Sequence, residues 1–141
     1  MSSINPLGRT VNFGRSASGG NVRFSLRNCS GVVFLVDTPA NASTLTVQEC
    51  NAASGGTAQN LAAITEYFTQ TNGVWTRLTQ AAAATVTVSG TPDLLAVYIP
   101  QGALSDGFAY LSPNHSAKAT EVVMSDLDVQ RFPQNLVDVR A

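Results

Sequence analysis

Residues 22–36 read VRFSLRNCSGVVFLV and contain two patterns that are typical of β-strands. From Val22 to Arg27 apolar and polar residues alternate, which is the period of a strand with one face buried and the other in water. Residues 32–36 are apolar without interruption, as expected of a strand that is covered on both faces. The segment 28–31 between them has the composition of a turn. The stretch therefore predicts two strands of a β-sheet protein.

Similar patterns recur along the chain on both sides of this stretch. Turn-forming residues, mainly Gly, Pro, Asn, Asp and Ser, separate them at short intervals, and no amphipathic helical pattern is sustained. Further strands are predicted at residues 44–49, 67–69, 74–76, 85–88, 94–99, 108–111, 121–124 and 127–132. About ten short strands at such spacing predict an all-β fold, an antiparallel β-sandwich or barrel.

Residues 57–70 fit two patterns at once, because their apolar residues match both the spacing of a helix and the alternation of a strand. The dipeptide Asn72-Gly73 follows them. It predicts a hairpin, since a type I′ turn needs positive φ angles at both of its central residues. We therefore expect a short helical turn near residues 59–63 and then a β-hairpin.

The chain has 141 residues, the size of a single domain whose core needs no metal or disulfide for stability. Residues 1–20 are rich in Gly, Ser and Thr and include only one short apolar alternation, so we expect an extended N-terminal arm there. The strand patterns define a β-sandwich domain at residues 21–132. Residues 133–141 are predicted to form an extended C-terminal tail.

Charged residues make up 12% of the chain, and the net charge is −1. Proteins that grip nucleic acid have a basic surface, so this composition argues against a nucleic-acid partner. No apolar run approaches the roughly 20 residues that cross a bilayer, and the first residues lack the apolar segment of a secretory signal. We therefore expect a soluble protein that is made in the cytoplasm and binds no membrane.

Residues that usually perform catalysis or bind metals are few and scattered. Cys29 and Cys50 lack the spacing and the neighbouring histidines of a zinc site; we expect partly buried thiols, with one disulfide as the alternative. His115 is the only histidine and is expected on a loop, away from any catalytic triad. The glycine pairs do not match a phosphate-binding loop. The sequence thus predicts no catalytic residues, no metal and no cofactor, and a protein that is not an enzyme.

Six aromatic residues on or near the predicted strands allow two interpretations. Aromatic side chains pack readily on half-buried sheet surfaces, so one interpretation places them in the core. The other is an exposed face that stacks on a sugar or binds a partner protein. The residues are Tyr67, Phe68, Trp75, Tyr98, Phe108 and Tyr110. A carbohydrate-binding module that uses Trp75 and Tyr110 is therefore an alternative function.

The two ends of the chain combine an extended character with scattered apolar side chains. An extended segment can add to the sheet edge of another protein while its side chains fill pockets. Such contacts are weak alone, but repetition on a symmetric lattice strengthens them. The residues that we expect to bind a partner are Ile4, Leu7, Val11, Phe13, Phe132, Leu136 and Val137.

Four segments of the chain read CSGVVF at 29–34, GVWTRL at 73–78, YIPQGALSDGF at 98–108 and DVQRFPQNL at 128–136. Together they resemble small virion proteins of tailed bacteriophages, in particular head decoration proteins. The resemblance implies a structural protein on the outer surface of the capsid, which binds the major capsid protein and its own copies, as a dimer or trimer, and stabilises the head. A tail tube or minor tail protein is the alternative within the same class.

Overall fold

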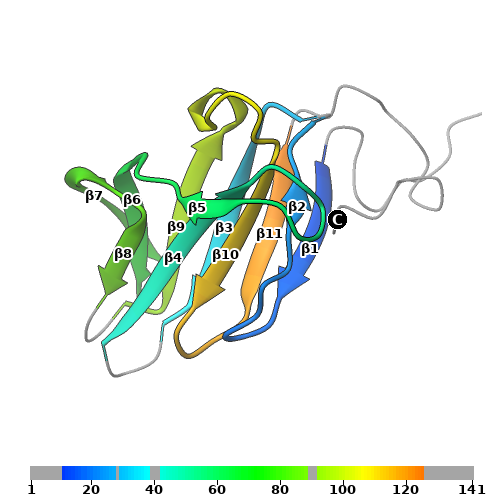
Figure 1. Cartoon of the computed structure of the whole chain (residues 1–141). Helices are drawn as coiled ribbons and strands as arrows, with labels where there is room; N and C mark the ends of the chain where they lie inside the picture. The colour runs from blue at the N-terminus through cyan, green and yellow to red at the C-terminus, as the bar shows by residue number, and fades with distance from the viewer. Residues whose placement is uncertain (1–10, 28, 39–41, 89–91, 126–141) are drawn as a thin grey trace, which may run out of the picture.

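The computed structural model describes residues 11–27, 29–38, 42–88 and 92–125, and within them it contains eleven β-strands and one short 3-10 helix. The strands form two sheets that pack face to face (Figure 1). Every strand pairing in these residues is antiparallel. The predicted all-β fold is therefore confirmed, in its sandwich form.

The larger sheet, sheet A, has six strands. Their spatial order is β1 (Val11–Ser16), β11 (Thr120–Ser125), β3 (Gly31–Asp37), β9 (Leu94–Pro100), β6 (Ile64–Thr71) and β7 (Val74–Ala83). Sheet B contains, in order, β2 (Phe24–Ser25), β10 (Tyr110–His115), β4 (Ser43–Cys50) and β5 (Ala58–Asn60). The registers place β8 (Thr85–Val88) on the same edge of β4 as β5. The 3-10 helix η1 (Gln101–Ala103) follows β9.

The strand order is that of a double-sheet jelly roll with an insertion. When β5, β6 and β7 are left out, sheet A has the order β1-β11-β3-β9 and sheet B has the order β2-β10-β4-β8. The inserted chain adds β5 to the edge of β4 and then extends sheet A beyond β9 with the β6–β7 hairpin (green in Figure 1). The insertion makes β7 the terminal strand of sheet A.

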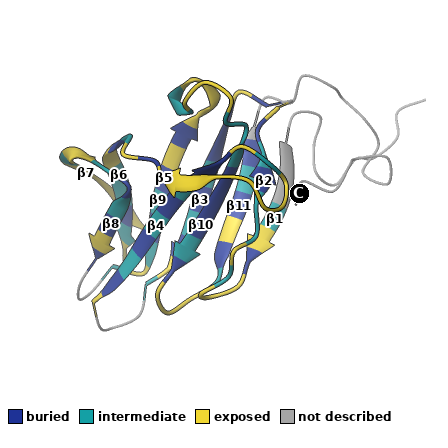
Figure 2. Ribbon diagram, viewed as in Figure 1, coloured by how far each residue is buried: buried dark blue, intermediate teal, exposed yellow. Residues whose placement is uncertain are grey.

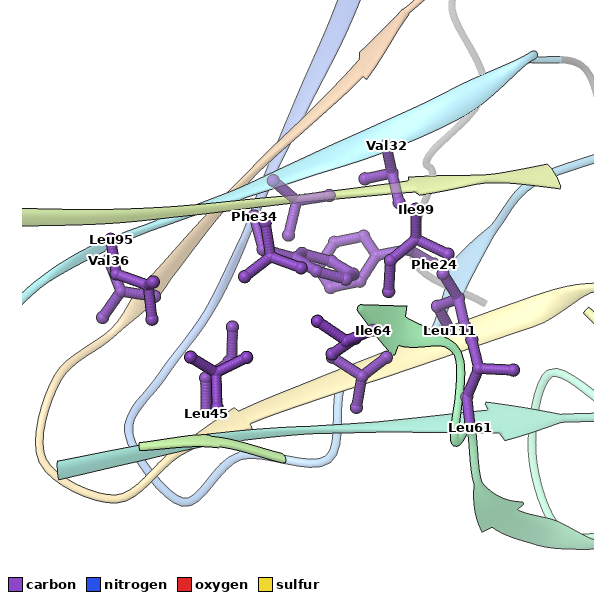
Figure 3. Close-up of a cluster of buried hydrophobic side chains, with 14 of the residues drawn as sticks. Phe24, Val32, Phe34, Val36, Leu45, Leu61, Ile64, Leu95, Ile99 and Leu111 are labelled. Atoms are coloured by element: carbon purple, nitrogen blue, oxygen red, sulfur yellow. The ribbon is translucent and has the colours of Figure 1, made fainter. Parts of the chain in front are cut away.

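The core lies between the two sheets. Because alternate residues of a strand point to opposite faces, the strands that face the other sheet contribute every second side chain to it, whereas β5 and β7 contribute no buried apolar residue. Figure 3 shows Phe34 and Ile99 from sheet A facing Leu45 and Leu111 from sheet B. All four of these side chains are 0–2% exposed. Burying each of them stabilises the fold by about 1.5–3 kcal/mol.

The prediction that residues 32–36 are covered on both faces is wrong. Phe34 and its alternate neighbours are buried in the core, but Val33 and Leu35 are only half-buried on the outer face of sheet A. All strands of the described residues belong to the two sheets, so none of them forms a third layer over this face. The alternation of burial along β3 is visible in Figure 2.

The Asn72-Gly73 hairpin is confirmed, but the helical turn before it is wrong. Asn72 and Gly73 have φ angles of 50° and 78°, as a type I′ turn requires, and they join β6 to β7. The segment predicted as a helical turn instead contains strand β5, because Gln59 pairs with Glu49 of β4. A strand partner ten residues earlier in the chain overrides the local helical spacing.

Strand β10 runs through residues 112–114, beyond the end of the strand predicted at 108–111. Pro113 fits in the strand because β2, the neighbour on one side, is only two residues long and ends before it. The missing N–H group of Pro113 therefore costs no ladder hydrogen bond there. On the same side, the hydroxyl of Ser16 donates to the carbonyl of Pro113 (3.4 Å). His115 is the buried last residue of β10, so its predicted place on a surface loop is also wrong.

The predicted N-terminal arm does not extend to residue 20. Val11–Ser16 is strand β1, which pairs with β11 at one edge of sheet A. The loop that follows is also attached to the sandwich, because the backbone N–H of Gly19 donates to the carbonyl of His115 (3.3 Å). The partner strand lies about a hundred residues later in the chain, so the short alternation at 11–13 gave little indication of it. Residues 1–10, the predicted strand at 127–132 and the predicted tail at 133–141 lie outside the described residues.

Candidate interaction surface

The residues predicted to bind a partner fall into two groups. Val11 and Phe13 belong to β1, where they lie opposite Ser125 and Val123 of β11. They are therefore part of sheet A and not of a free arm. The other predicted residues lie outside the described part of the chain: Ile4, Leu7, Phe132, Leu136 and Val137.

The structure separates the aromatic residues that the sequence singled out. Phe68, Trp75 and Tyr98 lie on the outer face of sheet A, whereas Tyr67 packs against the core. Tyr110 lies on the outer face of sheet B, because its neighbour in the strand is a core residue. Trp75 and Tyr110 are thus on opposite sides of the sandwich, and they cannot form one stacking platform for a sugar.

The outer face of sheet A has an apolar surface, which we call the sheet A patch. Its members are Val33, Leu35, Phe68, Trp75, Leu94, Ala96, Tyr98 and Val123. The registers place them in neighbouring rows. In one row Val33 lies between Val123 and Tyr98, and in the next Leu35 lies opposite Ala96. Apolar side chains that are neighbours on a sheet face act together as one surface.

Two aromatic side chains dominate the exposed area of the patch. Tyr98 is 50% exposed and Trp75 is 46% exposed, which places them among the most exposed large apolar residues of the described chain. Tyrosine and tryptophan are enriched where proteins bind each other, because they bury a large area at little cost in conformational entropy. An extended apolar face with such residues is typical of an interaction site.

The outer end of the Tyr98 ring lies over Gly31 of the neighbouring strand, which has no side chain there. A Cβ atom built on Gly31 would be 2.7 Å from the Cε2 and Cζ atoms of Tyr98, closer than non-bonded carbon atoms approach. Gly31 is buried under this ring. An aromatic ring that covers a cross-strand glycine protects the exposed backbone and fixes the register of the two strands.

Two ion pairs lie beside the sheet A patch, one towards each edge of the sheet. Arg15 Nε is 2.7 Å from Glu121 Oε1, and Arg77 Nε donates to Glu66 Oε2 at 2.7 Å. All four side chains are about half exposed or more, so each pair contributes only about 0–1 kcal/mol to stability. Their main effect is that each charge is neutralised within the sheet.

Val33 and Leu35 were not among the predicted site residues. The available signal was the apolar run at 32–36, which has apolar residues on both faces of one strand. Such a run is equally compatible with a strand buried on both faces. Only the absence of a third layer in the described structure distinguishes the two cases.

The outer face of sheet B has a different chemistry. It bears uncharged polar side chains and a shallow hollow of about 490 Å³, lined by Asn21, Thr44, Thr46, Gln48, Asn114 and Ser116. Many of these groups already have partners: Thr46 and Thr85 share a hydrogen bond (3.1 Å), and Gln48 Nε2 donates to Asn60 Oδ1 (3.3 Å). Among the described residues, the apolar surface formed across neighbouring strands lies on the outer face of sheet A.

Glu49 is a buried carboxylate that ties three segments together. It accepts hydrogen bonds from Gln59 Nε2 (2.6 Å), from the backbone N–H of Ser105 (2.8 Å) and from the Ser105 hydroxyl (2.7 Å). Burial alone would raise the pKa of Glu49, but these hydrogen bonds to its charged form outweigh burial and lower the pKa below its ordinary value. The contacts join β4 to β5 and to the loop before β10, so the role of Glu49 is structural.

His115 stabilises the turn that connects β10 of sheet B to β11 of sheet A. Its Nδ1 atom accepts hydrogen bonds from the backbone N–H groups of Ala117 (3.2 Å) and Lys118 (2.9 Å). The ring is buried, and burial lowers the pKa of His115. Because Nδ1 is an acceptor, the proton of the neutral ring is on Nε2, which has no hydrogen-bond partner among the described residues.

The described residues contain no group of three or more His, Cys, Asp or Glu side chains that could hold a metal ion. Cys29 and Cys50 are buried and are not joined by a disulfide, which confirms the prediction of buried thiols. Burial raises the pKa of the Cys50 thiol. No helix in the described ranges is long and apolar enough to cross a membrane.

Comparison with known proteins adds no identification. No protein-family model matches the chain, and no curated protein matches it.

Proposed function

We propose that this protein is a structural virion protein of a tailed bacteriophage, which decorates the outer surface of the capsid and stabilises the head. The observation that supports the proposal most is the sheet A patch, an apolar face with two exposed aromatic residues, Tyr98 and Trp75. The resemblance of the four sequence segments to head decoration proteins supports it as well. The jelly roll is one of the folds that build viral capsids, although a fold by itself does not determine function.

In this proposal the sheet A patch lies against the major capsid protein. Four of the charged groups beside the patch are already paired within the sheet, as Arg15–Glu121 and Arg77–Glu66. Asp37, opposite Leu94 at the end of β3, forms no ion pair among the described residues, so docking has to leave it at the solvent-exposed rim of the interface. A capsid repeats the same binding site many times. Contacts to several neighbours then raise the effective affinity without any single strong contact. Ile4, Leu7, Phe132, Leu136 and Val137 remain predicted additional contacts.

The test is the binding of the purified chain to heads prepared from virus that lacks it. Leu35→Lys places a charge on the patch, between Ala96 on one side and Glu121 on the other. The matched control Thr46→Lys places the same charge on a half-buried position of the outer face of sheet B. We expect at least tenfold weaker binding for Leu35→Lys and unchanged binding for Thr46→Lys. Tyr98→Ala should weaken binding in the same direction. Circular dichroism checks that each variant is folded.

Equal binding by all three variants would show that the patch is not the docking surface. Absence of the chain from purified virions would overturn the whole proposal. Immunogold labelling of intact particles distinguishes the head from the tail: label confined to the tail would favour the tube or minor tail alternative.

A further inference from the structure

Strand β7 is an unusually long edge strand for this fold. It has ten residues and pairs on one side with β6, while no described strand pairs with its other side. The edge strands of sheet B are much shorter, with two residues in β2, three in β5 and four in β8. Short edge strands are one way in which proteins avoid pairing with other chains, and β7 lacks this protection.

The sequence of β7 also lacks the residues that usually protect an edge. Between Val74 and Thr79 there is no Lys, Pro or acidic residue, and the only charge, on Arg77, is paired with Glu66 of the same hairpin. The register with β6 is regular over this stretch and becomes irregular only beyond it. Val74, Trp75 and Leu78 are 66%, 46% and 39% exposed. A flat edge with exposed apolar side chains is a template for strand pairing.

The turn geometry determines which backbone groups of β7 are available. The two-residue type I′ turn is closed by hydrogen bonding between its flanking residues, Thr71 and Val74. Backbone groups then alternate along an antiparallel ladder. Those of Val74, Thr76 and Leu78 point to β6, and those of Trp75 and Arg77 point to the open edge.

We propose that two copies of this chain pair antiparallel through β7, around a two-fold axis at Thr76. In this register Trp75 lies opposite Arg77 of the second copy, Val74 lies opposite Leu78 of the second copy, and the two Thr76 residues face each other. The backbone groups that point outward, those of Trp75 and Arg77, then satisfy one another. A two-fold interface needs a surface that is complementary to itself, and residues 74–78 form one.

Side-chain chemistry favours this register over those centred further along the strand. The arrangement places an aromatic ring beside a guanidinium group, an apolar pair and a threonine pair, all of which are favourable across strands. Shifting the axis to Arg77 would place two arginines directly opposite each other, which is unfavourable. Shifting it further, to Leu78, would require pairing through residues 80–82, where the register with β6 is lost and Gln80 instead donates to the carbonyls of Ile64 and Thr85.

The two-fold axis of an antiparallel strand pair is perpendicular to the sheet, so sheet A continues from one copy into the other. Both sheet A patches then face the same side, and Trp75 of each copy lies where they meet. The inference concerns only the edge of sheet A and does not depend on the proposed binding to a capsid. If that binding occurs, the dimer presents two docking faces to the shell at once.

The first measurement is sedimentation equilibrium of the full-length chain over a wide range of concentrations. The interface involves few residues of each copy and is at the small end of specific interfaces, so we expect a concentration-dependent monomer–dimer equilibrium. A chain that stays monomeric at all concentrations would overturn the inference. This result would leave the proposed binding of single copies to a capsid untouched.

Two sets of variants test the register. Thr76→Cys places two thiols opposite each other at a non-hydrogen-bonded pair, where a disulfide fits, so mild oxidation should crosslink it into a dimer. Thr87→Cys is the matched control, because Thr87 is also an exposed threonine on an edge strand, β8. Equal crosslinking of the two variants would contradict pairing at Thr76.

The second set uses charge. Thr76→Lys and Thr76→Glu should each raise the dimer dissociation constant at least tenfold, since like charges meet at the axis. An equimolar mixture of the two should form a heterodimer, because each residue 76 faces the other one. Failure of the mixture to associate, with both variants folded by circular dichroism, would exclude the proposed register.

Discussion

The ring of Tyr98 on β9 lies over Gly31 on β3, where any side chain would occupy the same space. A side chain at position 31 would therefore both destabilise the sandwich and displace a ring of the sheet A patch. The ring is held against the sheet, and its other side is exposed. The surface that we propose for binding therefore includes a ring whose position depends on the glycine beneath it.

Gly31→Ala should destabilise the protein by about 1 kcal/mol, because the added methyl group collides with the outer end of the Tyr98 ring and displaces it from the sheet. Thermal or urea unfolding measures the change. Gly102→Ala is the matched control, since no atom lies within 4 Å of a Cβ built there, and it should change stability by no more than about 0.5 kcal/mol. In a Tyr98→Ala background the cost of Gly31→Ala should largely disappear. A cost that persists there would show that the ring is not its cause.

Glu49→Ala should destabilise the fold by about 3 kcal/mol, because it removes a buried charged acceptor and leaves the donors of Gln59 and Ser105 without it. Glu66→Ala, which breaks an exposed ion pair, should cost no more than about 1 kcal/mol. Urea unfolding at neutral pH compares the two. Similar losses for both variants would contradict the structural role given to Glu49.

Stability should decrease as the pH falls below the ordinary pKa of histidine, 6.5. Because burial lowers the pKa of His115 in the folded chain, the unfolded chain binds more protons between the two pKa values, and the free energy of unfolding rises with pH in that interval. The contribution of His115 to the free energy of unfolding is complete above pH 6.5 and is lost as the pH falls through the lowered pKa of His115. Protonation also removes the Nδ1 acceptor that Ala117 and Lys118 use.

The check is urea unfolding of the protein at several pH values between 5 and 8. His115→Asn keeps an acceptor near the position of Nδ1 but does not titrate, so its stability should depend less on pH in this range. An unchanged pH dependence in the variant would assign the effect to other groups. Glu49 does not interfere, because its pKa is lowered from 4.5. Its contribution to stability is therefore complete above pH 4.5 and changes with pH only below that value.

The sequence predicted those parts of the fold whose cause is local. The β6–β7 hairpin followed from Asn72-Gly73, because the turn itself demands residues that tolerate positive φ. Strand β5 was missed because the helical spacing of its segment obscured the pairing with β4, about ten residues earlier, and the second half of β10 was missed because its partner in β4 is distant in the chain. Pro113 looked like a turn residue, and only the short length of β2 makes it acceptable in a strand.

The candidate surface was predicted in part. The sequence singled out Phe68, Trp75 and Tyr98 as aromatic residues of either a core or a binding face, and alternation alone cannot tell which face of a strand is inside. Which face of a strand is buried depends on where the neighbouring strands lie. Val33 and Leu35 were assigned to a strand covered on both faces, since an apolar run does not reveal that one of its faces has no covering layer.

We propose that this protein works by placing sheet A against the outside of a phage head. Cryo-electron microscopy of the heads tests it most directly. We expect density for the chain on the outer surface, with Leu35 and Tyr98 facing the major capsid protein and sheet B facing solvent. Heads without this density, or with sheet B against the shell, would contradict it.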